Sequence, residues 1–406
     1  MNILVINGDC IQTNSSANLC HLAYLRGLLA AGHQVTLLSA DGRDYTIDPA
    51  MTIPEQVMQY TIYGVSFYEK LSLRKRRKDT VLPSNMEAFQ NPTSDGIAYK
   101  VITKIKSAVL TLYGVHGIYI TFVRKAQKFR LDEKFDYIIS ISTPVTSHLL
   151  THNLLKTGRI KGSHWIQIWE DPWYSDAYGF NGKERIRREE KRLLAFAEKV
   201  CYVSPLTLEN QKKLFPEVAH KMFWQPLPFY YQCDKKCDYR VSGNNYGYFG
   251  DYAPVARDLE PFYIAAKKTG IRVNICGNPN NLFSSTEQIH VYPRLPLNEL
   301  KPIEDDTNVL VFLCNRKGGQ IPGKIYQYSA TNKIILFIMD GTEEEQRVLK
   351  GFFGKFNRYV FCKNTVEDIT RAIQKIENGM IGDIHNISID EFDPVKIITN
   401  ILKAGR

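Results

Sequence analysis

The stretch that decides the fold is VLVFLCNRKGGQIPGKIYQYSATNKIILFIM, residues 309–339. Its two apolar runs, 309–313 and 334–338, are typical of strands that are buried on both faces. Between them a glycine-rich turn leads into a segment, 323–331, that predicts a helix, because the fixed φ of Pro322 suits a first helical position. A strand, a helix and a second strand form a parallel βαβ unit, so this stretch predicts an α/β fold.

The start of the chain has the same rhythm. It predicts a strand over 2–7, a helix over 17–31 and a strand over 34–39. Apolar residues recur in this helix at spacings of three and four, as on a helix face that enters a core; they are Leu19, Leu22, Ala23, Leu25, Leu29 and Ala30. Strands are also predicted over 137–142, 165–169 and 199–203. A charged helix over 183–197 should bury Ile186, Leu193, Leu194 and Ala197.

Around residue 225 the pattern breaks, and residues 225–245 resemble a linker. Afterwards the alternation resumes, with helices predicted over 257–269, from 297, and over 365–377 and 394–403, and with strands predicted over 246–249, 272–276 and 291–292. A chain of 406 residues is long enough for two such cores. We therefore expect two doubly wound, Rossmann-like domains, 1–228 and 229–385, and a C-terminal helix within 386–406 that packs back on the first domain. Ligands of such domains bind at the carboxyl ends of the strands.

Composition and cysteine usage exclude several classes. With 44% hydrophobic and 23% charged residues, the chain is neither disordered nor fibrous. Its eight cysteines are scattered through apolar stretches, which is typical of reduced, buried thiols. Cys233 and Cys237 form a close pair without a second pair or a histidine cluster, so we expect no zinc site. The opening NILVING predicts a strand rather than a secretory leader, and we expect a cytoplasmic protein.

The formal net charge of +10 is the unusual feature. Residues 70–134, which we interpret as an insertion in the first domain, hold fourteen Lys and Arg against five Asp and Glu, a surplus of +9. This basic insertion includes RKRRK at 74–78 and an apolar run, 107–123, which has cations on both sides. We expect it to dock on an anionic membrane surface, since clustered cations are attracted to anionic headgroups; a solvated surface is the simpler alternative. No aromatic residues alternate with these cations, so nucleic acid is not an expected partner.

The glycine-rich turn is a candidate phosphate site. Backbone amides at Gly318, Gly319 and Gly323 and the start of the following helix would face an anion. Lys324 lies in the first helical turn, where a cation opposes the helix dipole unless a bound anion compensates. An ordinary strand-to-helix loop with a solvated lysine explains the same residues equally well.

The block QIPGKIYQYSATNKIIL, 320–336, resembles the nucleotide-sugar segment of family 4 retaining glycosyltransferases, which have the GT-B fold. The resemblance implies that Lys324 contacts the donor diphosphate and that Gln327 occupies the ribose-binding position. Two acidic residues of that family are replaced here, one by Gln327 and the other, eight residues earlier, by Gly319. Gln327 retains hydrogen-bonding capacity but carries no charge.

Other segments resemble the same family. YGYFGDYAPVARDLEPFYIAA, 246–266, is similar to its first strand and helix, so Gly250 should end the strand and Arg257 should open the helix and face the phosphates. Arg257 could equally pair with Asp258 or Glu260. The segment beginning VYPRLP at 291 implies that Arg294 lies near the base.

In the first domain, polar loops follow predicted strands. Asp171 and Asp176 in EDPWYSD are candidates for holding sugar hydroxyls or receiving the acceptor proton, although Asp before Pro is also a common turn former. Gly8 and Asp9 follow the first strand and should face the same cleft. No Asp-x-Asp motif is present, so we expect no metal and no other cofactor; Lys324 and Arg257 would stabilise the departing diphosphate, with Asp171 completing the catalytic set.

The sequence thus predicts a glycosyltransferase that moves a sugar from a nucleotide-sugar donor to a glycan or lipid-linked acceptor, with retention, in bacterial surface polysaccharide synthesis (capsule, O-antigen or exopolysaccharide). It would be peripheral on the inner face of the cell membrane. A nucleotide-sugar epimerase of the same fold and a non-catalytic sugar-nucleotide binding protein are the alternatives. A dinucleotide dehydrogenase is disfavoured because no G-x-G-x-x-G motif follows a strand.

Overall fold

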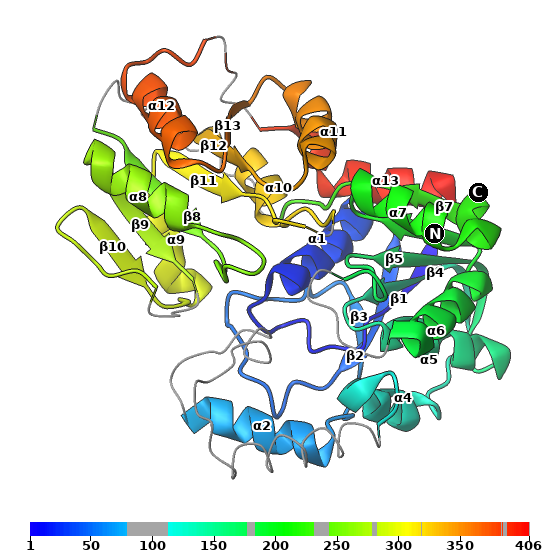
Figure 1. The fold of residues 1–406 in the computed structure, drawn as a ribbon. Helices are drawn as coiled ribbons and strands as arrows, with labels where there is room; N and C mark the ends of the chain where they lie inside the picture. The colour runs from blue at the N-terminus through cyan, green and yellow to red at the C-terminus, as the bar shows by residue number, and fades with distance from the viewer. Residues whose placement is uncertain are drawn as a thin grey trace.

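The structure is a computed structural model, and it describes residues 1–78, 113–176, 183–230, 243–277, 282–317, 319–382, 384 and 388–405. Two lobes are visible in Figure 1, each built on a parallel sheet with helices on its faces. We call them the first lobe and the second lobe. The predicted α/β class with two doubly wound halves is confirmed.

The first lobe contains a seven-stranded sheet in the order β3-β2-β1-β4-β5-β6-β7, and every neighbouring pair is parallel. Its strands are β1 Asn2–Ile6, β2 Gln34–Ala40, β3 Met58–Ile62, β4 Lys134–Ser142, β5 Lys161–Trp169, β6 Lys199–Tyr202 and β7 Met222–Trp224. The direction in which the chain adds strands reverses between β1 and β4. The sequence did not predict β3 or β7, which lie at the edges of the sheet: β3 (MQYTI) alternates in polarity and has no continuous apolar run, and β7 (MFW) is only three residues long.

The second lobe contains a six-stranded parallel sheet in the order β10-β9-β8-β11-β12-β13. Its strands are β8 Asn245–Phe249, β9 Arg272–Cys276, β10 Ile289–Tyr292, β11 Val309–Leu313, β12 Ile334–Met339 and β13 Tyr359–Lys363. All residues of β11 and β12 are buried, which agrees with their continuous apolar runs. Here the order reverses between β8 and β11.

Helices cover both sheets. Those that follow strands of the first lobe are α1 Ser16–Ala30, α2 Phe67–Lys78, α4 Ile120–Ala126, α5 Thr146–Lys156, α6 Lys183–Phe196 and α7 Pro205–Leu214. The second lobe carries α8 Glu260–Thr269, α9 Leu297–Asp306, α10 Lys324–Ser329, α11 Glu343–Gly354 and α12 Val366–Glu377. The last helix, α13 Pro394–Ala404, crosses back and lies on the first lobe (Figure 1).

Helix α1 is buried on almost all sides. Ser15 caps it by accepting a hydrogen bond from the Asn18 amide. A Cβ on Gly27 would come within 2.4 Å of the Pro394 carbonyl oxygen, so this glycine allows α13 to approach. Ala30, expected in the core, is exposed at the last position of the helix.

One apolar cluster runs from the first lobe into the second. It joins side chains of α1 and α13 to Leu227 and Phe229 of the crossing segment and to Ile325 and Tyr326 of α10. The Phe229 amide donates to the Phe392 carbonyl, which ties the crossing segment to the chain just before α13. The two lobes therefore share a core at the base of the cleft between them.

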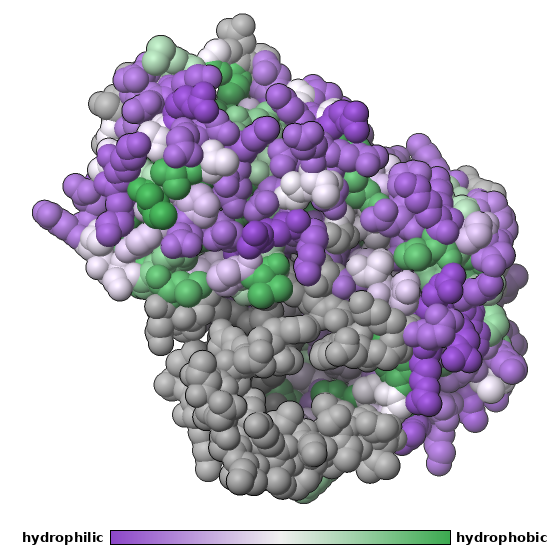
Figure 2. Space-filling model, viewed as in Figure 1, coloured by the Kyte–Doolittle hydropathy of each residue, from purple (hydrophilic) through white to green (hydrophobic). Residues whose placement is uncertain are grey.

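The face of the second lobe in Figure 2 is mainly hydrophilic, and the described cysteines are reduced. Hydrophilic side chains cover most of the face of the second lobe seen in Figure 2, with apolar ones scattered among them. In the described ranges, no helix is long and apolar enough to cross a bilayer. Six cysteines in those ranges are free thiols and buried, as expected: Cys10, Cys20, Cys201, Cys276, Cys314 and Cys362. Cys233 and Cys237 lie outside the described residues.

Candidate functional site

The candidate site lies where the strand order of each sheet reverses. Loops that leave neighbouring strands on opposite sides of a sheet open a crevice at their carboxyl ends. In the first lobe, the loops after β1, β4 and β5 meet there, and in the second lobe the loops after β8 and β11 do so. Hydrogen bonds between Gln320, in the loop after β11, and two aspartates in the loop after β5 show that the crevices face each other across one cleft.

The loop after β5 supplies two carboxylates to the cleft. The Nε2 atom of Gln320, from the second lobe, donates to Asp171 Oδ1 at 2.5 Å and to Asp176 Oδ1 at 3.2 Å. Asp171 and Asp176 were both predicted as cleft residues, and these contacts show that their carboxylates converge on one point.

Two buried side chains hold this loop from behind. Glu190 on α6 is fully buried and accepts hydrogen bonds from the backbone amides of Trp173, at 3.4 Å, and Tyr174, at 2.6 Å. Gln211 on α7 donates to the Ser175 hydroxyl at 2.9 Å. Burial raises the pKa of Glu190 to about 7, and the charge of Asp176 acts in the same direction. The loop is therefore anchored between Asp171 and Asp176.

The electrostatic environment of Asp171 is unusual for a side chain that water can reach. Because it lies between the lobes, reduced solvation raises the pKa of its carboxyl to about 7, and the negative charge of Asp176 contributes to this rise. The hydrogen bond from Gln320 and the positive charge of Arg257 act in the opposite direction. Asp171 can therefore exist as acid or as carboxylate near neutral pH.

The second lobe presents a cation and two amides to the same place. Arg257 Nε donates to Asn315 Oδ1 at 2.7 Å, and the Asn315 amide donates to the Gln320 carbonyl oxygen at 3.2 Å. Arg257 does not open a helix as predicted, since α8 begins at Glu260. It lies in the preceding turn, where its guanidinium also donates to the Asp251 carbonyl. Asp258, one of the two alternative partners, lies 3.9 Å from Arg316.

The glycine-rich turn is fastened to the first lobe. The carbonyl oxygen of Gly319 accepts hydrogen bonds from the hydroxyls of Ser204, at 2.6 Å, and Thr207, at 3.3 Å. Gly319 has φ of +70°, and a Cβ there would lie 3.1 Å from the Cβ of Leu206. Both its conformation and its close approach to the first lobe favour glycine. Gly318 lies outside the described residues.

Lys324 contacts an acid of its own lobe. Its Nζ atom lies 3.5 Å from Glu304 Oε1, and both side chains are largely buried. Their charges act on Cys276 at the end of β9: burial raises the pKa of this thiol to about 12, Glu304 adds to the rise and Lys324 opposes it. The pair therefore lies near the carboxyl end of the second sheet. Helix α10 is shorter than predicted, with six residues from Lys324, and Gly323 is its N-cap.

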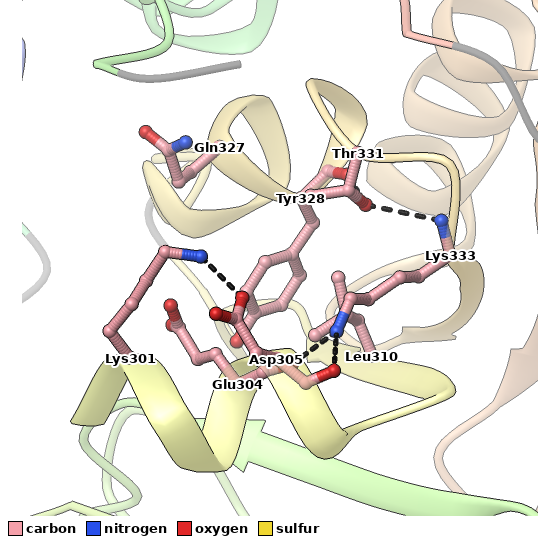
Figure 3. A pocket seen from close by; sticks show the side chains of 8 residues that line it. All are labelled: Lys301, Glu304, Asp305, Leu310, Gln327, Tyr328, Thr331 and Lys333. Carbon is pink, nitrogen blue, oxygen red and sulfur yellow. Dashed lines mark hydrogen bonds and ion pairs between the residues drawn. The ribbon is translucent and has the colours of Figure 1, made fainter. Parts of the chain in front are cut away.

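A small pocket lies beside this ion pair, between α9 and α10 (Figure 3). Glu304 and Lys301 line it from α9, and Gln327 lines it from α10. The buried ammonium of Lys333 closes it by donating to the backbone carbonyls of Glu304, Asp305 and Thr307. Glu304 thus brings a carboxylate to the region in which the sequence motif has none.

Gln327 and Arg294 both contact chain segments outside the second sheet. Gln327 Oε1 accepts a hydrogen bond from the Tyr230 amide at 2.8 Å, on the crossing segment. Arg294 donates to the carbonyl oxygen of Asn14 in the first lobe at 3.2 Å. Gly250 directly follows β8, as predicted, and its carbonyl oxygen leaves no room for a Cβ on Gly277, which would lie 2.2 Å away. Gln327 and Arg294 therefore join the second lobe to the crossing segment and to the first lobe.

Gly8 and Asp9 follow β1 but are held by their own lobe. The Gly8 amide donates to the Ser147 hydroxyl, and Asp9 accepts from the Cys10 amide. Burial raises the pKa of Asp9. Behind this loop His21 Nε2 lies 3.2 Å from Glu170 Oε2, and both side chains are buried. The His21–Glu170 pair was not predicted. Glu170 directly precedes Asp171 in the sequence.

The neutral and buried members of the site were not predicted. Gln320 and Asn315 stand within the quoted stretch, directly after β11, and the rule that ligands bind after strands applies to them as well. Glu190 carried a clearer signal. It lies four residues after Ile186 and three before Leu193, on the apolar face of α6, and an acid in that position is buried. Glu304 had no signal, because its partner lies 20 residues away.

No protein-family model matches the sequence, and no curated protein matches it. Solved structures do match over the whole chain. A sucrose-phosphate synthase from Thermosynechococcus elongatus has a TM-score of 0.57 at 12% identity, with 100% of this chain and 97% of that chain covered. A glycosyltransferase from Rickettsia africae has a TM-score of 0.50 at 10% identity, with 100% and 94% covered. The predicted GT-B fold, with two Rossmann-like domains facing a cleft, is confirmed.

Proposed function

We propose that the protein is a glycosyltransferase that transfers a sugar from a nucleotide-sugar donor, bound by the second lobe, to a hydroxyl of a glycan or lipid-linked glycan held by the first. The observation that carries this proposal is the meeting of the two crevices. Gln320, on the turn that also positions Arg257 through Asn315, contacts Asp171 and Asp176 of the other lobe. A cation for a leaving diphosphate and carboxylates for an acceptor hydroxyl then lie on opposite sides of one cleft.

On the donor side, Arg257 stabilises the negative charge that develops on the departing diphosphate. Its side chain is already oriented by Asn315 and by the Asp251 carbonyl, so little reorganisation is needed when the donor binds. Lys324 contributes a second cation once it exchanges Glu304 for phosphate oxygens. Gln327 and Glu304 supply hydrogen-bonding atoms near the nucleoside.

On the acceptor side, the ionised form of Asp171 accepts a hydrogen bond from the attacking hydroxyl, which orients it and raises its nucleophilicity. Asp176 holds a neighbouring hydroxyl. The C–O bond to the diphosphate breaks, the acceptor oxygen forms the new glycosidic bond, and the proton leaves to the departing phosphate or to Asp171. We propose that the anomeric configuration is retained, as the resemblance of residues 320–336 implies.

The first experiment identifies the donor. Thermal unfolding is followed by fluorimetry in the presence of UDP, GDP, CMP or ADP, since a ligand of the folded state raises the melting temperature. The matching nucleotide sugars are then assayed with glycan acceptors, and the anomeric proton coupling of the product reports retention or inversion. A protein that binds no nucleotide and transfers no sugar contradicts the proposal.

A lysine substitution tests the donor side separately. Lys324→Ala should abolish both donor hydrolysis and transfer, whereas Lys350→Ala, on the neighbouring helix α11, should leave both unchanged. Full activity of Lys324→Ala would remove this residue from the site.

Incubation of the protein with donor alone separates transfer from the alternatives. An epimerase converts the nucleotide sugar into its epimer without an acceptor. A non-catalytic binding protein gives a thermal shift but no product with any acceptor. A transferase forms a new glycoside only when the acceptor is present.

We further propose a cytoplasmic protein that docks on the inner face of the cell membrane and acts in surface polysaccharide synthesis. The basic insertion supports docking, and Phe67 and Leu71 on α2 present exposed apolar side chains four residues apart, directly before the cations of RKRRK. Such a helix lies in the interface between water and lipid. Residues 79–112 of the insertion lie outside the described residues.

Flotation with anionic vesicles tests docking. Replacement of 74–78 by glutamines should abolish flotation, because each cation near an anionic surface contributes about 1 kcal/mol. Replacement of Lys267, Lys268 and Arg272, exposed cations of the second lobe, should not. Absence of flotation for the unmodified protein would refute the docking proposal.

A further inference from the structure

Gln320 of the second lobe forms hydrogen bonds to the first lobe inside the cleft. Residues of both lobes hold it in place. Its carboxamide donates to Asp171 and Asp176. Its carbonyl oxygen accepts from Asn315, whose other amide atom holds Arg257. The preceding residue, Gly319, is fastened to Ser204 and Thr207 of the first lobe. The geometry leaves this side chain little freedom to move.

A glutamine is suited to the place it occupies. Two carboxylates that converge on one point repel each other, and a neutral –NH₂ group can donate one N–H to each. A lysine would do the same with a full charge, and a glutamate would add a third acid. The carboxamide therefore lowers the pKa of the Asp171 carboxyl without placing a positive charge in the cleft.

We propose that Gln320 is a positioning residue that couples the lobes: from the donor lobe it holds Asp171 and Asp176 in their working arrangement and controls the proton on Asp171. This inference rests on the proposed function, because Asp171 acts there as a carboxylate. Through Asn315 the same residue is linked to Arg257, so a donor that engages Arg257 is connected by three side chains to the acid that orients the acceptor.

Several ionisable groups face Asp171, and the proposal must hold in their presence. Those that disfavour its ionisation are Asp176 on the same loop and Glu170 at the end of β5, while Arg257 from the second lobe favours it. Glu170 is itself paired with His21 of α1, the Cys20 thiol of α1 lies nearby, and Glu190 of α6 faces Asp176. These neighbours are the same in every variant of Gln320, so only the contribution of residue 320 changes.

The direction of each change follows from the charges. In Gln320→Ala the ionised acid loses a donor, so its pKa rises and the pH at which activity is half-maximal moves upward, by about one unit. Gln320→Glu adds a negative charge and should move it further upward. Gln320→Lys adds a positive charge and should move it below that of the unmodified protein. A residue that only stabilises the fold would not produce shifts of opposite sign.

The test has two readouts. The first is the pH profile of kcat and of kcat/KM for the acceptor, measured for Gln320→Ala, Gln320→Glu, Gln320→Lys and the matched control Gln288→Ala, an exposed glutamine of the second lobe. The second is the titration of the Asp171 carboxyl by NMR in protein with ¹³C-labelled aspartate, assigned with Asp171→Asn. This second readout needs no turnover, so it remains informative if the protein transfers no sugar.

Opposite shifts for the Glu and Lys variants in the NMR titration, with no shift for Gln288→Ala, are the expected result. The same midpoint in all four folded proteins would overturn the proposal. Loss of activity by an equal factor at every pH would also overturn it, since Gln320 would then act on structure alone. Thermal melts identify any variant that fails to fold. If Gln320→Glu fails, Gln320→Ala and Gln320→Lys still test the opposite shifts; if Gln320→Lys fails, a larger upward shift for Gln320→Glu than for Gln320→Ala supports the proposal and equal midpoints overturn it.

Discussion

The two sides of the cleft are both held in place by hydrogen bonds, but one side is acidic and the other is basic. The loop 171–176 of the first lobe is acidic and is anchored from behind by the buried Glu190 and Gln211. The turn 315–320 of the second lobe carries the amides of Asn315 and Gln320 and holds the cation Arg257 through Asn315. Its anchors, Ser204 and Thr207, come from the other lobe. One side is held by its own domain, and the other is held across the interface.

The comparison explains why the charges differ. The pKa of Asp171 is raised to about 7, mainly by desolvation between the lobes and also by the charge of Asp176, so the acidic loop gains or loses a charge near neutral pH. A cation that is to meet a diphosphate must remain charged, and Arg257 does so at any physiological pH. We infer that the acidic side responds to pH and the basic side does not.

Removal of the cation should have the largest effect. Arg257→Ala should lower kcat by about 10²–10³-fold, because charge that develops on the leaving group loses its stabilising donor. Because Arg257 also lowers the pKa of Asp171, the loss should be larger at pH 6 than at pH 8. Arg272→Ala, at the opposite end of the second sheet, is the control and should retain full activity. An equal loss in both variants would show that net charge, rather than position, matters.

Removal of the acid should have the next largest effect. Asp171→Asn should lower transfer by about a hundredfold at pH 8, because the acceptor hydroxyl loses an ionised partner. Activity of the unmodified protein should fall as pH decreases through about 7, the pKa of Asp171, and this step should be absent in the variant. Asp132→Asn, an exposed aspartate of the same lobe, serves as the control.

The same substitution should change stability with a definite sign. The pKa of Asp171 in the folded protein lies above its ordinary value of 3.8, so the folded state binds the proton more tightly than the unfolded chain. Ionisation therefore costs stability as pH rises from about 4 to 7. The melting temperature of Asp171→Asn relative to the unmodified protein should be higher at pH 8 than at pH 4, as measured by calorimetry.

Weakening of the acidic loop's own anchor should have a smaller effect. Glu190→Gln keeps the size of the side chain but exchanges one acceptor oxygen for a donor, so one of the two amides at 173 and 174 loses its partner. We expect the acceptor KM to rise about tenfold and the donor affinity to stay unchanged. Isothermal titration with the nucleotide checks the second part. Glu209→Gln, exposed on α7, is the control, and a change in donor affinity would contradict the separation of the two sides.

A change at the cross-lobe anchor should be the mildest. Gly319→Ala must place a Cβ at a φ of +70° and close to Leu206, which should lower the free energy of unfolding by about 1–2 kcal/mol. Gly382 has a similar φ of +67° with open space around a Cβ, so Gly382→Ala should lose only the free energy that the strained backbone conformation costs. Denaturant titration compares the two. Equal losses would mean that the approach of the lobes at Leu206 contributes nothing.

The sequence by itself determined the architecture. The apolar runs of β11 and β12 and the spacing on α1 and α6 are local patterns, and a strand that is buried on both faces has the same signature wherever it lies. The location of the cleft also followed, because loops after parallel strands meet at one edge. Asp171, Asp176, Arg257 and Gly319 could therefore be named as neighbours of a cleft.

Only the tertiary structure decided what these residues touch. Lys324 pairs with Glu304, Arg257 is oriented by Asn315, and the two acids share the amide of Gln320. Each of these partners is distant in the sequence and chemically ordinary, so no local pattern marks it. Hydrogen bonds and pKa values depend on which groups folding brings within a few ångströms and on how much water it removes, and neither quantity is encoded in spacing along the chain.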